Sequence, residues 1–187
     1  MKKYLVSLAV LSSAAALLSG CQKESAQPTA ATSASAPTGL TQLPVSINAA
    51  MVALTSQAAD YLFAPGNGDM PKNDRDWALV QNAGYEIMLA GKVMQVPGTG
   101  EFDAQWVAEA EWIKLANELT DIGSEAEKLA AAKSTDRAQW QAVGDKLVQN
   151  CLACHEMFKP DTPSQGILHG ATKRESLGES IFPTTSY

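Results

Sequence analysis

The residues best suited to chemistry lie in one short segment near the C-terminal end of the chain. The 187-residue sequence contains only three cysteines and two histidines. Cys151, Cys154 and His155 fall within the five residues CLACH. Cysteine is too scarce for a disulfide-stabilised scaffold, so each cysteine needs its own explanation.

Several types of site use two cysteines at this spacing. A dithiol redox pair normally opens a helix in a thioredoxin-like fold, whereas this pair lies deep in an expected helix. A structural zinc site needs four ligands, and only His169 and carboxylates are left to complete one. Covalent haem attachment needs two thiols one helical turn apart and an imidazole that reaches the iron, which Cys151, Cys154 and His155 supply. The sequence therefore favours one haem c, with a plain disulfide as the alternative.

The N-terminal segment agrees with export, which haem c attachment requires. Lys2 and Lys3 precede an apolar run from Tyr4 to Leu18. This run is shorter than the ~20 residues of a membrane span but suits a signal peptide. It ends in Leu-Ser-Gly-Cys21, which resembles the lipobox of bacterial lipoproteins, whose cysteine is acylated after cleavage. We therefore expect a signal peptide over residues 1–20 and lipidation at Cys21, with an ordinary secretory signal as the alternative.

The expected location is the periplasm, with the protein held at a membrane through the lipid on Cys21. Gln22 rather than Asp follows Cys21, which favours the outer over the inner membrane. Residues 21–44 are rich in Ala, Ser, Thr, Pro and Gln and contain no aromatic residue, so we expect a flexible tether.

The net charge of the mature chain limits the classes of partner that we expect it to bind. Removal of residues 1–20 leaves twelve Lys and Arg against twenty Asp and Glu, a net charge of −8. Such a chain is a poor candidate for binding nucleic acid or an anionic membrane face. A partner protein with a basic docking patch suits it better, and the sequence leaves a homodimer open.

Residues 45–160 show helical periodicity without a sustained strand pattern. A first helix from about Val45 is stopped by the segment Pro65-Gly66-Asn67-Gly68, and a second begins at an Asn73 or Asp74 cap and ends by Pro97. A long third helix runs from about 103 to 133, with Gly123 as a weak point. Ser134 or Thr135 caps a fourth, which Pro160 closes. We predict an all-α, antiparallel four-helix bundle with haem c on the last helix. Residues 161–187 form an extension that is draped on the bundle or partly disordered.

A helical bundle with C-x-x-C-H on its last helix resembles the class II c-type cytochromes, the cytochrome c prime group. The resemblance covers roughly residues 45–160 and excludes the tether and the extension. It implies thioether bonds at Cys151 and Cys154 and His155 as the proximal iron ligand. In low-spin members a methionine of the first helix is the sixth ligand, and Met51 is at the corresponding position. In high-spin members an apolar side chain leaves that position open to small gases.

Other side chains compete with Met51 for the sixth position. A lone methionine on an apolar face is usually a packing residue. Met88, Met94 and Met70 are weaker candidates, and His169 would give bis-histidine iron. Met157 is too close to His155 to reach the opposite face of the haem.

The expected function is electron transfer through one haem, with no sign of an enzyme. No nucleophile constellation, acid–base pair or phosphate loop occurs in the sequence. The first alternative is a five-coordinate haem module that binds nitric oxide or carbon monoxide. The second is a structural subunit of an envelope complex, in which the haem only holds the helices of the bundle together.

Overall fold

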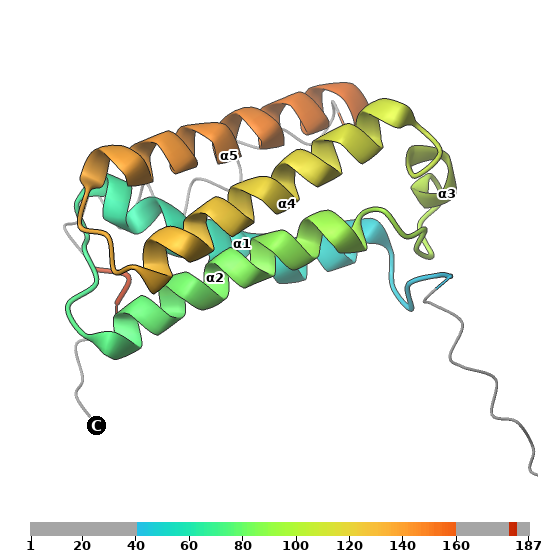
Figure 1. Cartoon of the computed structure of the whole chain (residues 1–187). Coiled ribbons are helices and arrows are strands. Elements are labelled where there is room, and N and C mark those ends of the chain that lie inside the picture. The colour runs from blue at the N-terminus through green and yellow to red at the C-terminus, as the bar shows by residue number, and fades with distance from the viewer. Residues whose placement is uncertain (1–40, 160–179, 183–187) are drawn as a thin grey trace, which may run out of the picture. The chain divides into compact units, whose positions relative to one another are not determined.

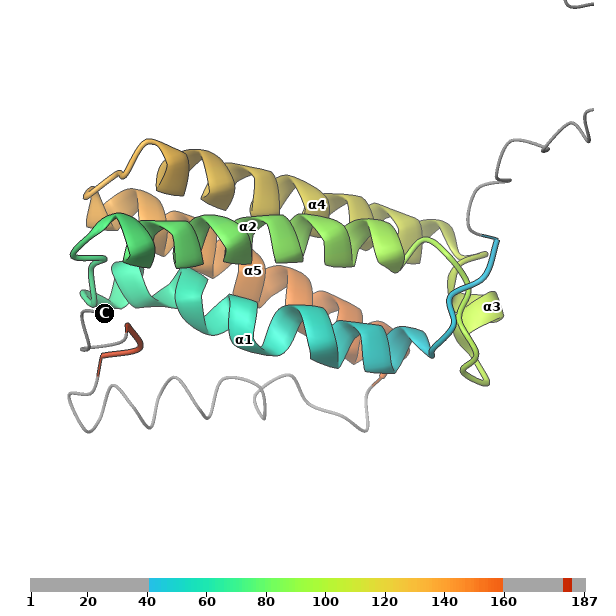
Figure 2. The ribbon, with the colours of Figure 1, turned by 90° about the horizontal axis from the view of Figure 1, so that it is seen from below.

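The computed structural model describes residues 41–159 and 180–182. Its helices are α1 (Ile47–Asn67), α2 (Asp74–Val93), α3 (Asp103–Trp106), α4 (Ala110–Ala131) and α5 (Arg137–Phe158). No strand occurs in the described part of the chain, so the predicted all-α class is confirmed. Figures 1 and 2 show α1, α2, α4 and α5 side by side, which is compatible with a helical bundle. Cys21 and His169 lie outside the described residues. None of the helices within the described ranges has the length and apolar character needed to cross a membrane.

The first two helices have the ends that local sequence signals predict. The Ser46 hydroxyl accepts a hydrogen bond from Ala49 N at the start of α1. Asn73, rather than Asp74, caps α2 by accepting from Asp76 N at 3.0 Å. Helix α1 continues through Pro65 and ends at Asn67, because Gly68 adopts a left-handed conformation with φ of 98°.

The third predicted helix is interrupted, which corrects the prediction of one continuous helix over 103–133. The chain forms the short α3, then leaves helical geometry and restarts as α4. Two tertiary contacts explain the break. The buried Asp103 carboxylate accepts hydrogen bonds from Ile47 N (2.8 Å) and Gly100 N (2.9 Å), which binds α3 to the start of α1. The Trp106 ring stacks on Trp112 with centroids 5.0 Å apart, which folds α3 against α4.

The cap of α5 also differs from the prediction. Asp136, rather than Ser134 or Thr135, is the N-cap, and its carboxylate accepts from the backbone N–H groups of residues 138 and 139. The backbone carbonyl of Ser134 instead accepts a hydrogen bond from Trp140 Nε1 at 2.8 Å. Because Trp140 is fully buried, this bond fixes residue 134 outside the helix and moves the cap to Asp136.

Helices α2 and α4 approach each other most closely through glycine. A methyl group added to Gly123 of α4 would lie 2.5 Å from Met88 N and 2.7 Å from Gly84 O of α2. A methyl group on Gly91 would collide with Ala116 O. Gly123 therefore lies within an uninterrupted helix and allows close backbone contact, rather than weakening the helix.

Segments on both sides of the helices pack against them. Leu43 is buried, and its N–H donates to Pro97 O at 2.8 Å, so the packed region begins before residue 45. Near the C-terminus, Ile181 N donates to the Asp69 carboxylate at 2.8 Å. Phe182 is buried against Tyr61, with ring centroids 5.9 Å apart. The described part of the extension, residues 180–182, thus lies on the helices.

Candidate cofactor cavity

A cavity lies between the N-terminal part of α1 and the C-terminal part of α5. Its empty space is about 900 Å³ when its opening to solvent is included. Helix α1 lines it with Ile47, Asn48, Met51, Thr55, Ala59 and Phe63. Helix α5 and the residue after it line it with Leu147, Val148, Asn150, Cys151, Cys154, His155 and Lys159. Most of these side chains are apolar, so the cavity suits an apolar group.

The CLACH segment forms part of this cavity wall. Cys151, Cys154 and His155 all line it, as the helical spacing of three and four residues requires. They lie in the last turns of α5, which ends at Phe158. Lys159 adopts a non-helical conformation, and a proline at position 160 disfavours continuation of the helix. One face of a single helix thus presents two thiols and an imidazole to one space.

Met51 faces the same cavity from the other helix. It lines the space opposite the three residues of α5, and the neighbouring Thr55 hydroxyl donates to Met51 O at 2.7 Å. Met94, the residue after α2, is buried and lines the cavity too. The structure does not place the other methionines there: Met88 packs at Gly123, and Met157 is 57% exposed. The candidates for a sixth ligand among the described residues narrow to Met51 and Met94.

The two thiols have the properties of buried cysteines. Both are free in the structure rather than joined in a disulfide. Burial raises the pKa of Cys151 to about 11. Burial, and to a lesser degree the charge of Cys151, raises the pKa of Cys154 to about 12. Redox-active dithiols have lowered pKa values instead, so the environment of this pair is unlike that of a dithiol oxidoreductase.

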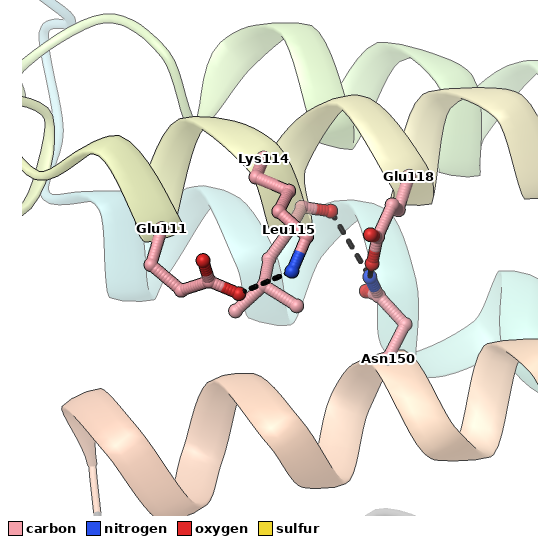
Figure 3. A network of polar contacts seen from close by, with 5 residues as sticks. All are labelled: Glu111, Lys114, Leu115, Glu118 and Asn150. Carbon is pink, nitrogen blue, oxygen red and sulfur yellow. Dashed lines mark hydrogen bonds and ion pairs between the residues drawn. The ribbon is translucent and has the colours of Figure 1, made fainter.

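Asn150 fixes the position of the CLACH segment along the helix axis relative to α4. Its side-chain amide is buried and donates to Leu115 O at 3.0 Å, with Glu118 Oε2 at 3.5 Å. Figure 3 shows this amide reaching from α5 to α4, beside the separate ion pair of Lys114 with Glu111. Because Asn150 directly precedes Cys151, these bonds set the register of the thiols along the cavity.

Aromatic rings close the end of the cavity. Trp106 and Trp112 line it and stack on each other, and Phe158 meets Trp112 edge-on at 5.1 Å. Lys159 Nζ lies 5.8 Å from the Trp106 ring centroid and donates to Asn48 Oδ1 at 2.7 Å. That bond joins the end of α5 to the start of α1 across the cavity.

The donor set can hold a haem but does not form a ready metal site. Within residues 41–159 and 180–182, no group of three or more His, Cys, Asp or Glu side chains is arranged to bind a metal ion. Two thiols one turn apart would instead form thioethers by adding to the two vinyl groups of a porphyrin, and the adjacent His155 would supply a nitrogen ligand to its iron. An apolar cavity that also presents Met51 fits such a group.

Sequence reasoning found the three residues of the motif and Met51, but not the groups that position them. Asn150 and Lys159 carried no signal beyond their proximity to the motif. The four tryptophans of the sequence fall into two groups. Trp77 and Trp140 pack between helices, while Trp106 and Trp112 form the cavity wall. We found no protein-family model, no curated protein and no solved structure that matches this chain.

Proposed function

We propose that the protein is a lipid-anchored, periplasm-facing electron carrier with one haem c on the last helix of an antiparallel four-helix bundle. The observation that carries the proposal is the convergence of Cys151, Cys154, His155 and Met51 on one apolar cavity. The colours of Figure 1 run in opposite directions along successive long helices, which supports the antiparallel arrangement.

Each residue of the cavity has a distinct role in this proposal. Cys151 and Cys154 hold the cofactor covalently, and His155 supplies the proximal ligand. Met51 supplies a thioether sulfur from α1, which raises the reduction potential relative to other ligands. The bound haem would supply reversible one-electron chemistry, while the protein sets its ligands and its burial. The apolar lining excludes water and so lowers the local dielectric constant around the cofactor.

Cofactor attachment tests the proposal directly. The full chain, expressed with the periplasmic machinery for cytochrome c maturation, should keep haem after denaturing electrophoresis and acid–acetone extraction. Cys151→Ala/Cys154→Ala should lose covalent haem. The control Thr135→Ala changes an exposed residue just before the opposite end of α5 and should keep it. Complete extraction of haem from the wild type would exclude thioether attachment.

An absorption spectrum separates electron transfer from gas binding. Low-spin iron with a weak sulfur-to-iron charge-transfer band supports Met51 ligation and electron transfer. The observation that favours gas binding is the apolar character of much of the α1 wall, including Ile47, Ala59 and Phe63. High-spin iron that binds carbon monoxide readily in the wild type would favour this second function. A redox-inert low-spin protein would instead indicate a structural haem.

The location is proposed from the sequence and tested separately. Cys21→Ser removes the thiol that would carry lipid, and residues 41–159 should fold unchanged. Detergent partitioning should move the wild type, but not the variant, into the detergent phase. Equal partitioning of both forms into water would contradict the lipid anchor. Absence of the wild-type protein from the outer-membrane fraction would contradict the expected localisation to the outer membrane.

A further inference from the structure

A groove that contains half-exposed apolar side chains among polar groups lies beside the cofactor cavity. It is lined by Phe102, Gln105, Trp106, Glu109, Met157 and Phe158, and we call it the α3 groove. Phe102 is 51% exposed and Met157 is 57% exposed. Figure 1 shows α3 at the end of the molecule where α4 begins and α5 ends. Large exposed apolar side chains gathered in one concave place are typical of interaction sites.

The α3 groove shares a wall with the cavity. Trp106 lines both spaces, so this ring separates them. The ring of Phe102 stacks on Trp106 at 6.1 Å, and Trp106 stacks in turn on Trp112 at 5.0 Å. The rings thus run in contact from the exposed groove to the buried cavity wall. A partner seated in the groove would therefore lie close to whatever the cavity holds.

Carboxylates accompany the apolar centre of the groove. Glu109 lines it, while Glu101 and Glu156 are the chain neighbours of Phe102 and Met157, and all three glutamates are exposed. None of the three forms an ion pair with a described residue. Lys159 is the cation nearest the Trp106 ring, and its Nζ already donates to Asn48. Among the described residues, the charge around the groove is therefore mainly negative.

We infer that the α3 groove is the docking surface for a basic redox protein, an inference that rests on the proposed electron-transfer function. An apolar centre with a charged, solvent-accessible rim is the usual arrangement of a protein interface. Acidic rims steer a basic partner and hold it in register, and weak redox complexes use interfaces below about 1,200 Å². The same carboxylates repel a second copy of this acidic chain and an anionic lipid surface.

The test measures binding of the haem-loaded protein to a small lysine-rich cytochrome c as the basic probe. Titration calorimetry at about 10 mM ionic strength, where the Debye length is ~30 Å, should detect a complex that weakens at 150 mM. Phe102→Ala/Met157→Ala should weaken binding about tenfold at both ionic strengths, because it removes the apolar centre. Glu109→Gln/Glu156→Gln should weaken it about tenfold at low ionic strength and far less at high.

A matched control lies on α2. Leu89 is 53% exposed and Glu86 is exposed, so Leu89→Ala/Glu86→Gln removes similar groups from another surface. This variant should bind the probe as the wild type does. Binding that is equally weak in the control and in the groove variants would overturn the docking site. So would groove variants that alter only self-association in sedimentation, or only binding to anionic vesicles.

Absorption spectra of all variants separate this inference from the proposed function. If all variants keep covalent haem and unchanged spectra, and the groove variants bind the probe as the wild type does, the docking role of the α3 groove is wrong. The proposed electron-transfer function would not be affected. A wild type without covalent haem would overturn the proposed function and the docking inference with it. Carbodiimide cross-links from the probe to Glu109 or Glu156 would support the site independently of any electron-transfer rate.

Discussion

Helices α2 and α4 meet through glycine, whereas α1 and α5 leave a cavity between two of their ends. Along α2 and α4 a single added methyl group would strike backbone atoms, as at Gly123. Along α1 and α5, Gly66 O accepts from Arg137 Nε at 2.8 Å near one end, and Lys159 Nζ donates to Asn48 Oδ1 near the other. Between these contacts, Met51 and the CLACH residues line the cavity. Helices α2 and α4 pack closely and contribute Ile87, Trp112 and Leu119 to the cavity, whereas α1 and α5 provide most of its lining.

Side-chain volume at the helix contacts explains why the cavity lies between α1 and α5. Glycine removes side-chain volume and lets backbones pack closely, so no space remains for a ligand. Large or flexible side chains, such as Met51 and Phe63, keep α1 and α5 apart at the cavity. The bonds of Asn150 and Lys159 then hold the open end in a defined geometry.

The largest effect should follow removal of the proposed cofactor. Cys151→Ala/Cys154→Ala protein without haem should keep slow amide exchange in α2 and α4 but lose protection in α1 and α5. We expect a loss of at least about 100-fold, because a ligand at 100 times its dissociation constant contributes ~2.7 kcal/mol. Hydrogen exchange read by mass spectrometry measures this. Uniform loss of protection over all four helices would show that the two pairs are not energetically distinct.

The next effect concerns the glycine contact itself. Gly123→Ala should destabilise the protein by about 1–3 kcal/mol, because its methyl group meets backbone atoms of α2. Gly144→Ala is the matched control on α5. Its methyl group would meet only the Phe63 side chain, at 3.3 Å, and alanine favours helix by ~1 kcal/mol. Urea unfolding compares the two, and equal free-energy losses would contradict close packing confined to α2 and α4.

Helix ends show how far the sequence determines this architecture. Asn73 and Gly68 act as caps through their own side chain or backbone, so their roles can be predicted from local sequence. The break between α3 and α4 contains no glycine or proline. It depends on Trp106 stacking on Trp112 and on the Asp103 carboxylate accepting a hydrogen bond from Ile47 N, which lies 56 residues away in the sequence. Local propensity therefore predicted a continuous helix.

The residues of the candidate site also divide into those that local sequence identifies and those whose role depends on the fold. The CLACH segment is contiguous, so its three reactive groups can be recognised without the fold. Met51 was placed by helical periodicity and a family resemblance, and the structure puts it in the cavity. The hydrogen bond from the Asn150 amide to Leu115 O depends on how far α4 and α5 are shifted relative to each other along their axes. The shared wall at Trp106 depends on how α3 folds against α4. Neither the shift between α4 and α5 nor the packing of α3 against α4 can be predicted from a local sequence pattern.

A smaller effect on stability, with a large spectroscopic consequence, is expected at Met51. Met51→Leu keeps the volume of the side chain and removes the sulfur, so it should cost less than ~1.5 kcal/mol. The iron should become high-spin, bind carbon monoxide and fall in reduction potential. Met88→Leu, in the α2 and α4 contact, is the control and should leave the spectrum unchanged. A low-spin Met51 variant, combined with a high-spin Met94→Leu variant, would assign the ligand to Met94.

The smallest effect is expected at an exposed ion pair between α2 and the residues after α4. Lys133 Nζ lies 2.7 Å from Asp74 Oδ1. The hydrogen bond and the charge of Lys133 lower the pKa of Asp74 below its ordinary value of 3.8. Because the folded pKa is the lower one, the pair stabilises the protein above the unfolded pKa of about 4. This contribution is lost as the pH falls through the folded pKa.

Asp74→Asn should therefore lower the urea midpoint slightly at pH 7 and match the wild type in acid. The change stays small because both side chains are exposed and solvent screens their attraction. Lys133→Met removes the partner but keeps the carboxylate at the start of α2, where the helix dipole still favours it. It should consequently cost less than Asp74→Asn. A deficit in Asp74→Asn that persists unchanged to about pH 2 would show that lost packing, and not the carboxylate charge, is responsible.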